Sequence, residues 1–245
     1  IHLTGQKFLS NCTSAMVPQL RSTSSEIIYP DSDGHPMSDN TKQFRWIVVV
    51  QQNLDWLFTD DPNVFVAGDL LWYPVEGDNK TRIGPDVLVA LGRPKGDRGS
   101  YKQWQEGNIA PQVLFEILSP SNTKPEMTRK RQFYDRFGVE EYYEYDPDTD
   151  RLQGWQRVNR GLAAIVPIEN WVSPRLGIRF DLSGAELQIY RPDGQPFLSY
   201  AETSEQVTRA WAELEQAQTE LAQERQRADR LAAQLRSLGI DPEQL

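Results

Sequence analysis

IGPDVLVAL (residues 83–91) and PQVLFEILSP (residues 111–120) are two short apolar runs, and each carries one acid. Runs of Val, Ile, Leu and Phe bounded by Gly and Pro are typical of buried strands. The acids are Asp86 and Glu116, and burial of an ionised carboxylate is costly unless it is paired with a cation or binds a metal. The two runs therefore predict neighbouring strands with a cationic group or a metal ion beside the acids.

The segments around these runs alternate between helical and strand patterns. Upstream, residues 41–58 predict a helix with Ser38 or Asp39 as its N-cap, and residues 64–73 predict a strand. The helix prediction rests on near-helical spacing of Phe44, Ile47, Val48, Leu54, Leu57 and Phe58. Downstream, we expect a helix at 127–137 ended by Gly138 and strands at 140–145, 152–158, 163–168 and 187–190. The predicted fold is α/β, with a core order α-β-β-β-α-β and extra strands.

The tail after Tyr200 has a different pattern. Apolar residues step by alternating threes and fours, the a/d seam of a coiled coil. The seam positions are Val207, Ala210, Leu214, Ala217, Leu221, Glu224, Ala228, Leu231, Leu235 and Leu238. Glu224 is the one break, and Gly239 and Pro242 mark the end. A single helix is marginal in water, so we expect a partner. A second copy of the chain is favoured over a fold-back on the chain's own domain or a different protein.

Composition sets the outline of the molecule. We expect an N-terminal arm at 1–39 that packs on the core, one domain at 40–200 and the coiled-coil helix at 201–245. The net charge of −9 excludes a generally basic nucleic-acid coat, so any phosphate binding must be local. No apolar run is long enough to span a bilayer. Cys12 is the only cysteine, which favours a cytoplasmic protein without disulfides.

The residue types at the two acids suit a hard divalent cation. Mg²⁺ or Mn²⁺ takes carboxylate oxygens, whereas zinc is disfavoured because His2 and His35 are the only histidines. Lys130 lies in the helix that follows the Glu116 strand, and that helix could direct the ammonium group toward the acids. There it would orient a water molecule or stabilise negative charge on a phosphate.

The combination of motifs resembles a known group of enzymes. Pro85-Asp86 followed by Glu116 on the next strand, in this element order, is similar to the PD-(D/E)XK nuclease superfamily. GPDVLV at 84–89, FEILSPS at 115–121, Lys130 and GVEEYY at 138–143 more closely resemble the Uma-two family of restriction-endonuclease-like proteins of cyanobacteria. The resemblance covers residues 40–200, and the arm and tail lie outside it.

The resemblance implies a restriction-endonuclease-like fold with a mixed sheet flanked by helices. It implies that the Asp86 and Glu116 carboxylates, with the carbonyl of Ile117, hold Mg²⁺. The lysine that the superfamily carries two positions after the Glu is Leu118 here, and Lys130 could supply its charge from the helix. The further polar site residue of the superfamily has several candidates, namely Gln51, Gln52, Asp55 and Asp69. Ser119 could contact a phosphate or orient Glu116, although a turn role is the commoner one.

One loop has the composition of a DNA-binding segment. Residues 92–104 supply Arg93, Lys95, Arg98 and Lys102 beside aromatic residues. Because this loop joins the two acid-bearing strands, we expect it near the site, where it could contact phosphates and stack on bases. Arg129, beside Lys130, is a further candidate for nucleic-acid binding. A solvated, flexible loop is the competing interpretation.

These observations predict a Mg²⁺-dependent DNA endonuclease that dimerises through its tail. Two alternatives belong to other classes. A nuclease fold that binds nucleic acid or protein without cutting is suggested by Leu118 and the acidic net charge. A scaffold protein that works through its coiled coil is the other. Asp86 could also simply cap a turn after Pro85, and Lys130 could be an ordinary solvated helix charge.

Overall fold

The computed structural model describes residues 27–34 and 36–239, so Cys12, His2, His35, Pro242 and most of the predicted arm lie outside the described residues. Six strands form one mixed sheet in the order β1-β3-β5-β6-β7-β8. Their bounds are β1 Val64–Gly68, β3 Val87–Leu91, β5 Val113–Ile117, β6 Glu141–Asp146, β7 Arg151–Val158 and β8 Gly161–Ala164. Every neighbouring pair is antiparallel except β5 and β6, which are parallel. The mixed α/β fold expected from the sequence is confirmed.

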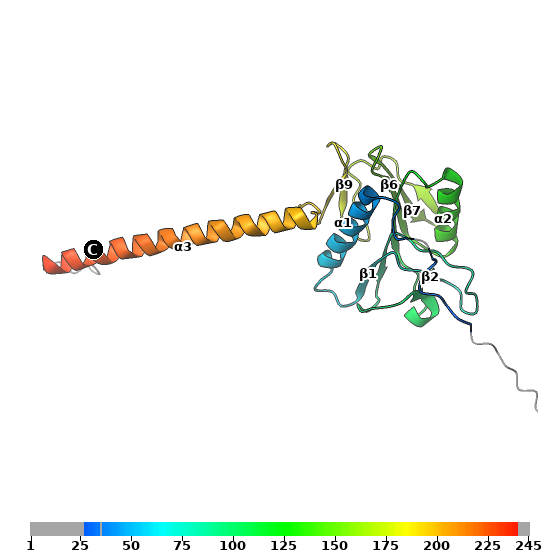
Figure 1. Cartoon of the computed structure of the whole chain (residues 1–245), viewed down its shortest axis with the longest axis horizontal. Coiled ribbons are helices and arrows are strands. Elements are labelled where there is room, and N and C mark those ends of the chain that lie inside the picture. The colour runs from blue at the N-terminus through cyan, green and yellow to red at the C-terminus, as the bar shows by residue number, and fades with distance from the viewer. Residues whose placement is uncertain (1–26, 35, 240–245) are drawn as a thin grey trace, which may run out of the picture.

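One helix covers each face of this sheet (Figure 1). Helix α1 (Thr41–Leu57) packs Ile47, Val50 and Leu54 on the face that carries Val87 and Val89. Helix α2 (Lys124–Arg136) supplies Tyr134 to the opposite face, beside Leu88, Leu114 and Tyr142. Side chains alternate along a strand, so each strand contributes to both apolar layers. Helix α2 also makes the crossover that the parallel β5–β6 pair requires.

Smaller elements complete the domain. Strands β9 (Arg179–Asp181) and β10 (Gln188–Tyr190) form an antiparallel pair whose Phe180 and Ile189 pack on the α1 face. Strand β2 (Trp72–Tyr73) pairs in parallel with β4 (Tyr101–Lys102), and a 3₁₀ turn, η1, spans Gln103–Glu106. Described residues before α1 pack nearby, because Tyr73 donates to the Pro30 carbonyl and the Tyr29 and Tyr73 rings make an edge contact.

Helix α3 (Tyr200–Ser237) leaves the domain as a single rod (Figure 1). The sequence predicted this helix correctly. None of its residues is buried. Among the described residues, no helix combines the length and the apolar character that crossing a bilayer requires.

Several predicted boundaries were wrong. The N-cap of α1 is Asn40, whose side chain accepts from the backbone of Lys42 and Gln43. Phe44, expected on the buried face, is 47% exposed, and Trp46 and Val50 are buried instead. The predicted strand at 64–73 is two strands, because Asp69 adopts a positive φ of 48° and turns the chain. Helix α2 begins at Lys124, after Thr123, rather than at Met127, and β8 ends at Ala164 rather than at Ile168.

Candidate active site

Asp86 and Glu116 project from the same face of the sheet. Strands β3 and β5 are antiparallel with Val87 opposite Phe115, so a one-residue extension of this register sets Asp86 opposite Glu116. Asp86 alternates with Val87 and therefore shares the α2 face with Leu88, as Glu116 does with Leu114. Asp86 Oδ2 also accepts a hydrogen bond of 2.6 Å from the backbone N–H of Ile117. The two acids that the sequence singled out are thus brought together.

Helix α2 supplies two partners for the buried Glu116. The Glu116 side chain is only 3% exposed, and its Oε2 lies 2.8 Å from Lys130 Nζ. Its Oε1 accepts a short hydrogen bond from the Tyr134 hydroxyl. Lys130 and Tyr134 are four residues apart, which sets them on the same side of the helix. The Lys130 ammonium therefore reaches the acids from the helix, as the sequence suggested.

The start of α2 is fixed by its own sequence. The Thr123 side chain accepts from the backbone N–H of Glu126, and the Glu126 carboxylate accepts from the backbone N–H of Thr123. This capping box satisfies two of the backbone donors at a helix start, and Pro125 suits the first turn. The helix that presents Lys130 and Tyr134 therefore begins at a defined residue.

The electrostatics of the pair reflect its crowding. Burial, together with the negative charge of Glu116, raises the pKa of Asp86 well above its usual range. Burial alone would lower the pKa of Lys130, but the charges of Glu116 and Asp86 outweigh it and raise that pKa. Two carboxylates side by side disfavour each other's ionisation unless a cation intervenes. The Lys130 ammonium thus contacts Glu116 and is stabilised by the negative charges of both acids.

Beside the acids lies a cavity of about 460 Å³, which Asp86 lines and Glu116 reaches only through its partner Lys130. Asp86 and Lys130 line it, and so does Asp69, whose backbone N–H bonds the Asp86 carbonyl at 3.0 Å. Burial raises the pKa of Asp69, and the negative charge of Asp33 adds to this. Arg82 supplies a second cation to the wall, and its Nη1 bonds the Asn79 carbonyl at 3.2 Å. The predicted candidate Asp69 is therefore at the cavity, next to Asp86.

Gln43 of α1 reaches the same place from the other side of the sheet. Its Nε2 donates to the Ile117 carbonyl at 2.8 Å, and its Oε1 accepts from the backbone N–H of Asp39 at 2.8 Å. The predicted candidate Ser119 does not line the cavity itself. Its hydroxyl donates to Oδ2 of the cavity-lining Asp39 at 2.6 Å. Hydrogen bonds from Ser119 and Ser121 lower the pKa of Asp39.

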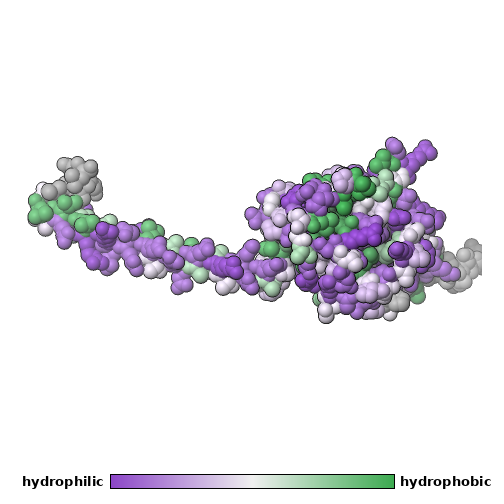
Figure 2. Space-filling model, turned by 90° about the horizontal axis from the view of Figure 1, so that it is seen from above, coloured by the Kyte–Doolittle hydropathy of each residue, from purple (hydrophilic) through white to green (hydrophobic). Residues whose placement is uncertain are grey.

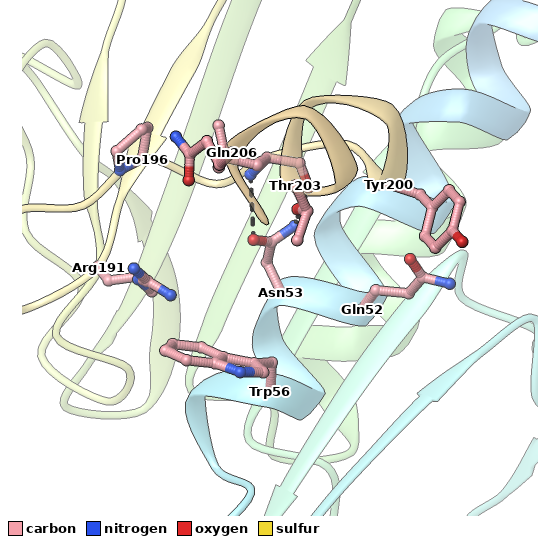
Figure 3. Close-up of a pocket in the computed structure, with 9 residues that line it drawn as sticks. Gln52, Asn53, Trp56, Arg191, Pro196, Tyr200, Thr203 and Gln206 are labelled. Carbon is pink, nitrogen blue, oxygen red and sulfur yellow. Dashed lines mark hydrogen bonds between the residues drawn. The ribbon is translucent and has the colours of Figure 1, made fainter. Parts of the chain in front are cut away.

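Gln52 does not share this cavity. It lines a separate pocket of about 380 Å³ between α1 and the start of α3, with Trp56, Arg191 and Tyr200 (Figure 3). Gln51 and Asp55, the other helix candidates, border a third pocket beside Lys95. The glutamine on α1 that faces the acids is Gln43, two helical turns earlier. Sequence reasoning missed it because Gln43 joins the site only through its contact with Ile117, 74 residues away in the chain, which no local pattern marks.

The basic loop at 92–104 does not begin near the acids. Asp86 precedes β3 and Gly92 follows it, so the six residue steps along the strand separate them by about 20 Å. Lys95 pairs with Asp55 at 3.0 Å, and Arg98 pairs with Glu106 at 2.6 Å and lies over the Phe65 ring. The antiparallel β3–β5 pair puts the start of the loop at the opposite end of the sheet, whereas its end returns toward the cavity, since the Tyr101 N–H donates to the carbonyl of the cavity-lining Leu71 at 2.7 Å. A role of this loop in nucleic-acid binding stays a prediction.

The other basic candidates are scattered. Lys102 lies over the Tyr29 ring, and Arg93 Nε bonds the carbonyl of Gly92. Arg129 is exposed on α2, one residue before Lys130. Tyr134 and Arg82, which sequence reasoning missed, contact or adjoin the acids instead. The spacing of Tyr134 from Lys130 was a usable signal, whereas nothing in the sequence around Arg82 marked it.

The donor set suits a hard divalent ion in its chemistry. Asp86, Glu116 and the Ile117 carbonyl offer oxygen atoms alone, which Mg²⁺ and Mn²⁺ prefer. Lys130 and Tyr134 bond the Glu116 oxygens and Gln43 bonds the Ile117 carbonyl, and each of these oxygens keeps a lone pair that could bind an ion. In the described part of the chain no cluster of three or more His, Cys, Asp or Glu is arranged to hold a metal. A site here would thus depend on two carboxylates and one backbone carbonyl.

Comparisons with known proteins show the family of the chain. Residues 36–189 match the profile of the Uma2 family, described as "Putative restriction endonuclease". A solved structure from Anabaena variabilis, titled a "putative nuclease belonging to DUF820", is similar with a TM-score of 0.42 and 15% identity. That match covers 56% of this chain and 73% of the other. No curated protein matches. The family match includes Asp86, Glu116 and Lys130 and spans more than half of the sequence, so the chain belongs to the Uma2 family.

Proposed function

We propose that this protein is a Mg²⁺-dependent endonuclease that hydrolyses phosphodiester bonds in DNA. One observation supports this most strongly: Asp86 and Glu116 meet on one face of the sheet, and Lys130 Nζ lies 2.8 Å from Glu116 at a cavity. A buried pair of acids with an ammonium group is an expensive arrangement for stability alone. The family to which the chain belongs is one of restriction-endonuclease type.

Each residue has a role in this proposal. Asp86, Glu116 and the Ile117 carbonyl would hold the divalent ion. The ion would supply polarisation of the phosphate and a lower pKa for the attacking water. Tyr134 holds Glu116 Oε1, and Gln43 holds the backbone at Ile117, so the ligand atoms are fixed in advance. Leu118 stands where the superfamily has a lysine, and Lys130 would supply the missing positive charge from α2. Its ammonium would orient the water or stabilise the developing negative charge.

The test is cleavage of a mixed panel of single-stranded, double-stranded and supercoiled DNA with Mg²⁺ or Mn²⁺. We expect cleavage that Asp86→Asn and Glu116→Gln each reduce by at least about 10²- to 10³-fold. Asp60→Asn, an acid in an exposed turn after α1, is the matched control and should cleave normally. Folded protein that cuts no member of the panel with either ion would contradict the proposal.

A binding module without catalysis is the second candidate. Leu118 at the usual lysine position favours it, as does the pairing of Lys130 with Glu116, which leaves a metal to compete with an ammonium. DNA binding that persists in the wild type, with no cleavage under any metal condition, would support this candidate. RNA in the same panel tests the choice of nucleic acid.

We further propose the division of the chain into an arm at 1–39, the nuclease domain at 40–200 and the tail at 201–245. The tail joins two copies of the chain by a coiled coil. A cytoplasmic setting fits a chain whose only cysteine is Cys12.

A further inference from the structure

Helix α3 exposes an apolar seam along its length that only Glu224 interrupts. Val207, Leu214 and Leu221 are each about half exposed, as is Leu231, and they recur every seven residues or at the matching d position. Figure 2 shows apolar patches spaced along the rod between hydrophilic surface. No residue of this 38-residue helix is buried. Most of the stability of a helix in a protein comes from packing of its apolar face, so this seam needs a partner.

The charges of α3 are divided between its two halves. Residues 200–220 carry five glutamates and one arginine, a net charge of −4, and residues 221–237 carry four arginines and two acids, a net charge of +2. The helix dipole favours such a division only in the first and last turn. Glu213, Glu215 and Glu220 lie far inside the helix, so the dipole does not account for them. The acidic half of one helix is instead complementary to the basic half of another copy laid in the opposite direction.

Glu224 gives an independent indication of direction. In a parallel pair each seam residue faces its own copy, so Glu224 would face a second glutamate within the apolar seam. In an antiparallel pair in which residues 208–237 of the two helices overlap, Glu224 faces Leu221 of the partner subunit. The same register sets Ala217 opposite the partner's Ala228, Leu214 opposite the partner's Leu231 and Val207 opposite the partner's Leu238. It therefore removes the like-charge layer and keeps the remaining layers apolar.

We propose that α3 forms an antiparallel coiled coil with α3 of a second copy of this chain. Two hydrogen bonds attach the segment just before α3 to the domain. Asn53 Nδ2 donates to the Leu198 carbonyl at 2.8 Å, and the Leu198 N–H donates to Asn53 Oδ1 at 3.1 Å (Figure 3). The Ser199 capping box starts the helix at the next residue. The two domains therefore lie at opposite ends of the paired rod, and each 38-residue helix in it spans about 57 Å.

This geometry bears on how the two domains would meet DNA, and that step rests on the proposed function. Ten base pairs of duplex span about 34 Å, so sites at the ends of the rod would act on positions well over a turn apart. The dimer would engage two separated segments rather than both strands at one step. The pairing itself depends on α3 alone, so its test is independent of cleavage.

Disulfide cross-linking of the full chain distinguishes the two directions. In a Cys12→Ser background, Ala217→Cys and Ala228→Cys are produced separately and also co-expressed, and each sample is oxidised. An antiparallel pair gives covalent dimer only in the co-expressed sample. A parallel pair gives it with Ala217→Cys alone, which would overturn the proposal. Thr219→Cys, on the outer side of the helix, is the control and should remain uncross-linked in either case.

The mass in solution tests whether the helices pair at all. Light scattering of the full chain should give twice the 28.1 kDa of the monomer. Leu221→Asp puts a charge in the seam and should give monomer, and Thr219→Asp, two residues away on the outer side, should remain dimeric. A monomeric wild-type chain, or a dimer unaffected by Leu221→Asp, contradicts the proposal. The cleavage assay is scored separately, so inactive protein that still cross-links between 217 and 228 leaves this inference intact.

Discussion

The two oxygens of Glu116 have chemically different partners. Oε1 accepts from Tyr134, and burial together with the Glu116 charge raises the pKa of that phenol, so it remains a hydrogen-bond donor. Oε2 faces the Lys130 ammonium. The phenol therefore fixes the orientation of the carboxylate, while the ammonium is the partner that can respond to a substrate or an ion at the cavity.

Lys130→Met should reduce DNA cleavage by about 10²- to 10³-fold, because it removes a preorganised positive charge at the reacting phosphate. It also leaves a buried carboxylate without its partner, so unfolding by denaturant should show a loss of about 3 kcal/mol or more. Lys124→Met, at the exposed start of α2, is the matched control. Full activity of Lys130→Met would show that the ammonium has no part in the chemistry.

A second buried acid lies behind the site. Glu144 on β6 is paired in register with Glu116 and accepts from the Tyr142 hydroxyl at 2.8 Å. Burial raises the pKa of Glu144, with a further contribution from the Glu116 charge. Below the ordinary glutamate pKa of 4.5 both folded and unfolded chains hold the proton. As the pH rises above this value the unfolded chain ionises first, and stability falls.

Glu144→Gln should therefore stabilise the protein at neutral pH, since the amide can still accept from Tyr142 without a buried charge. The gain should disappear below about pH 4.5, where Glu144 is protonated in both states. Urea unfolding of both proteins across this range measures it. A gain that is equal at pH 4 and pH 7 would contradict the electrostatic explanation.

The part of the site that the sequence predicted consists of residues marked by their own neighbourhood. Asp86 and Glu116 stood out because each interrupts an apolar run, and Lys130 because it follows closely in the next helix. Gln43 and Arg82 join the site through the meeting of distant elements, and no local pattern marks them. The course of the basic loop was not predictable for the same reason, because strand direction determines that the loop starts at the far end of the sheet.

At the scale of elements, α2 is the one on which the site depends most. It connects β5 to β6, covers one sheet face and carries both partners of Glu116. Its start was missed in the sequence because the apolar pattern begins at Met127, while the polar capping box precedes it. The strands were predicted well where apolar residues are continuous. The two-residue strands β2 and β4 and the three-residue β9 are too short to leave such a pattern.

Thr123→Ala should destabilise the domain by about 1 kcal/mol, since it removes the side chain that accepts from the Glu126 backbone. The matched control is Thr128→Ala, within the same helix and exposed, where alanine is the better helix former. Chemical unfolding of the two variants measures the difference. Equal stability of the two variants would indicate that the capping box contributes nothing measurable.

At the scale of the whole molecule, the buried core lies in the domain and the tail lies outside it. The two apolar layers are built from residues before Tyr200, and α3 adds no buried residue to them. Removal of residues 207–245 should therefore leave the thermal midpoint of the domain within about 2 °C of the full chain, because surface segments contribute little. Differential scanning calorimetry measures this. A large drop would show that the tail packs on a domain, its own or the partner's.

The central claim is that Asp86 and Glu116 together hold one divalent cation. Calorimetric titration of the full chain with Mn²⁺ tests it directly, with Asp86→Asn, Glu116→Gln and the exposed Asp60→Asn beside the wild type. We predict one saturable site in the wild type and in Asp60→Asn, and its loss in both of the other variants. Binding that is absent from the wild type, or that persists when either acid is neutralised, would contradict the account.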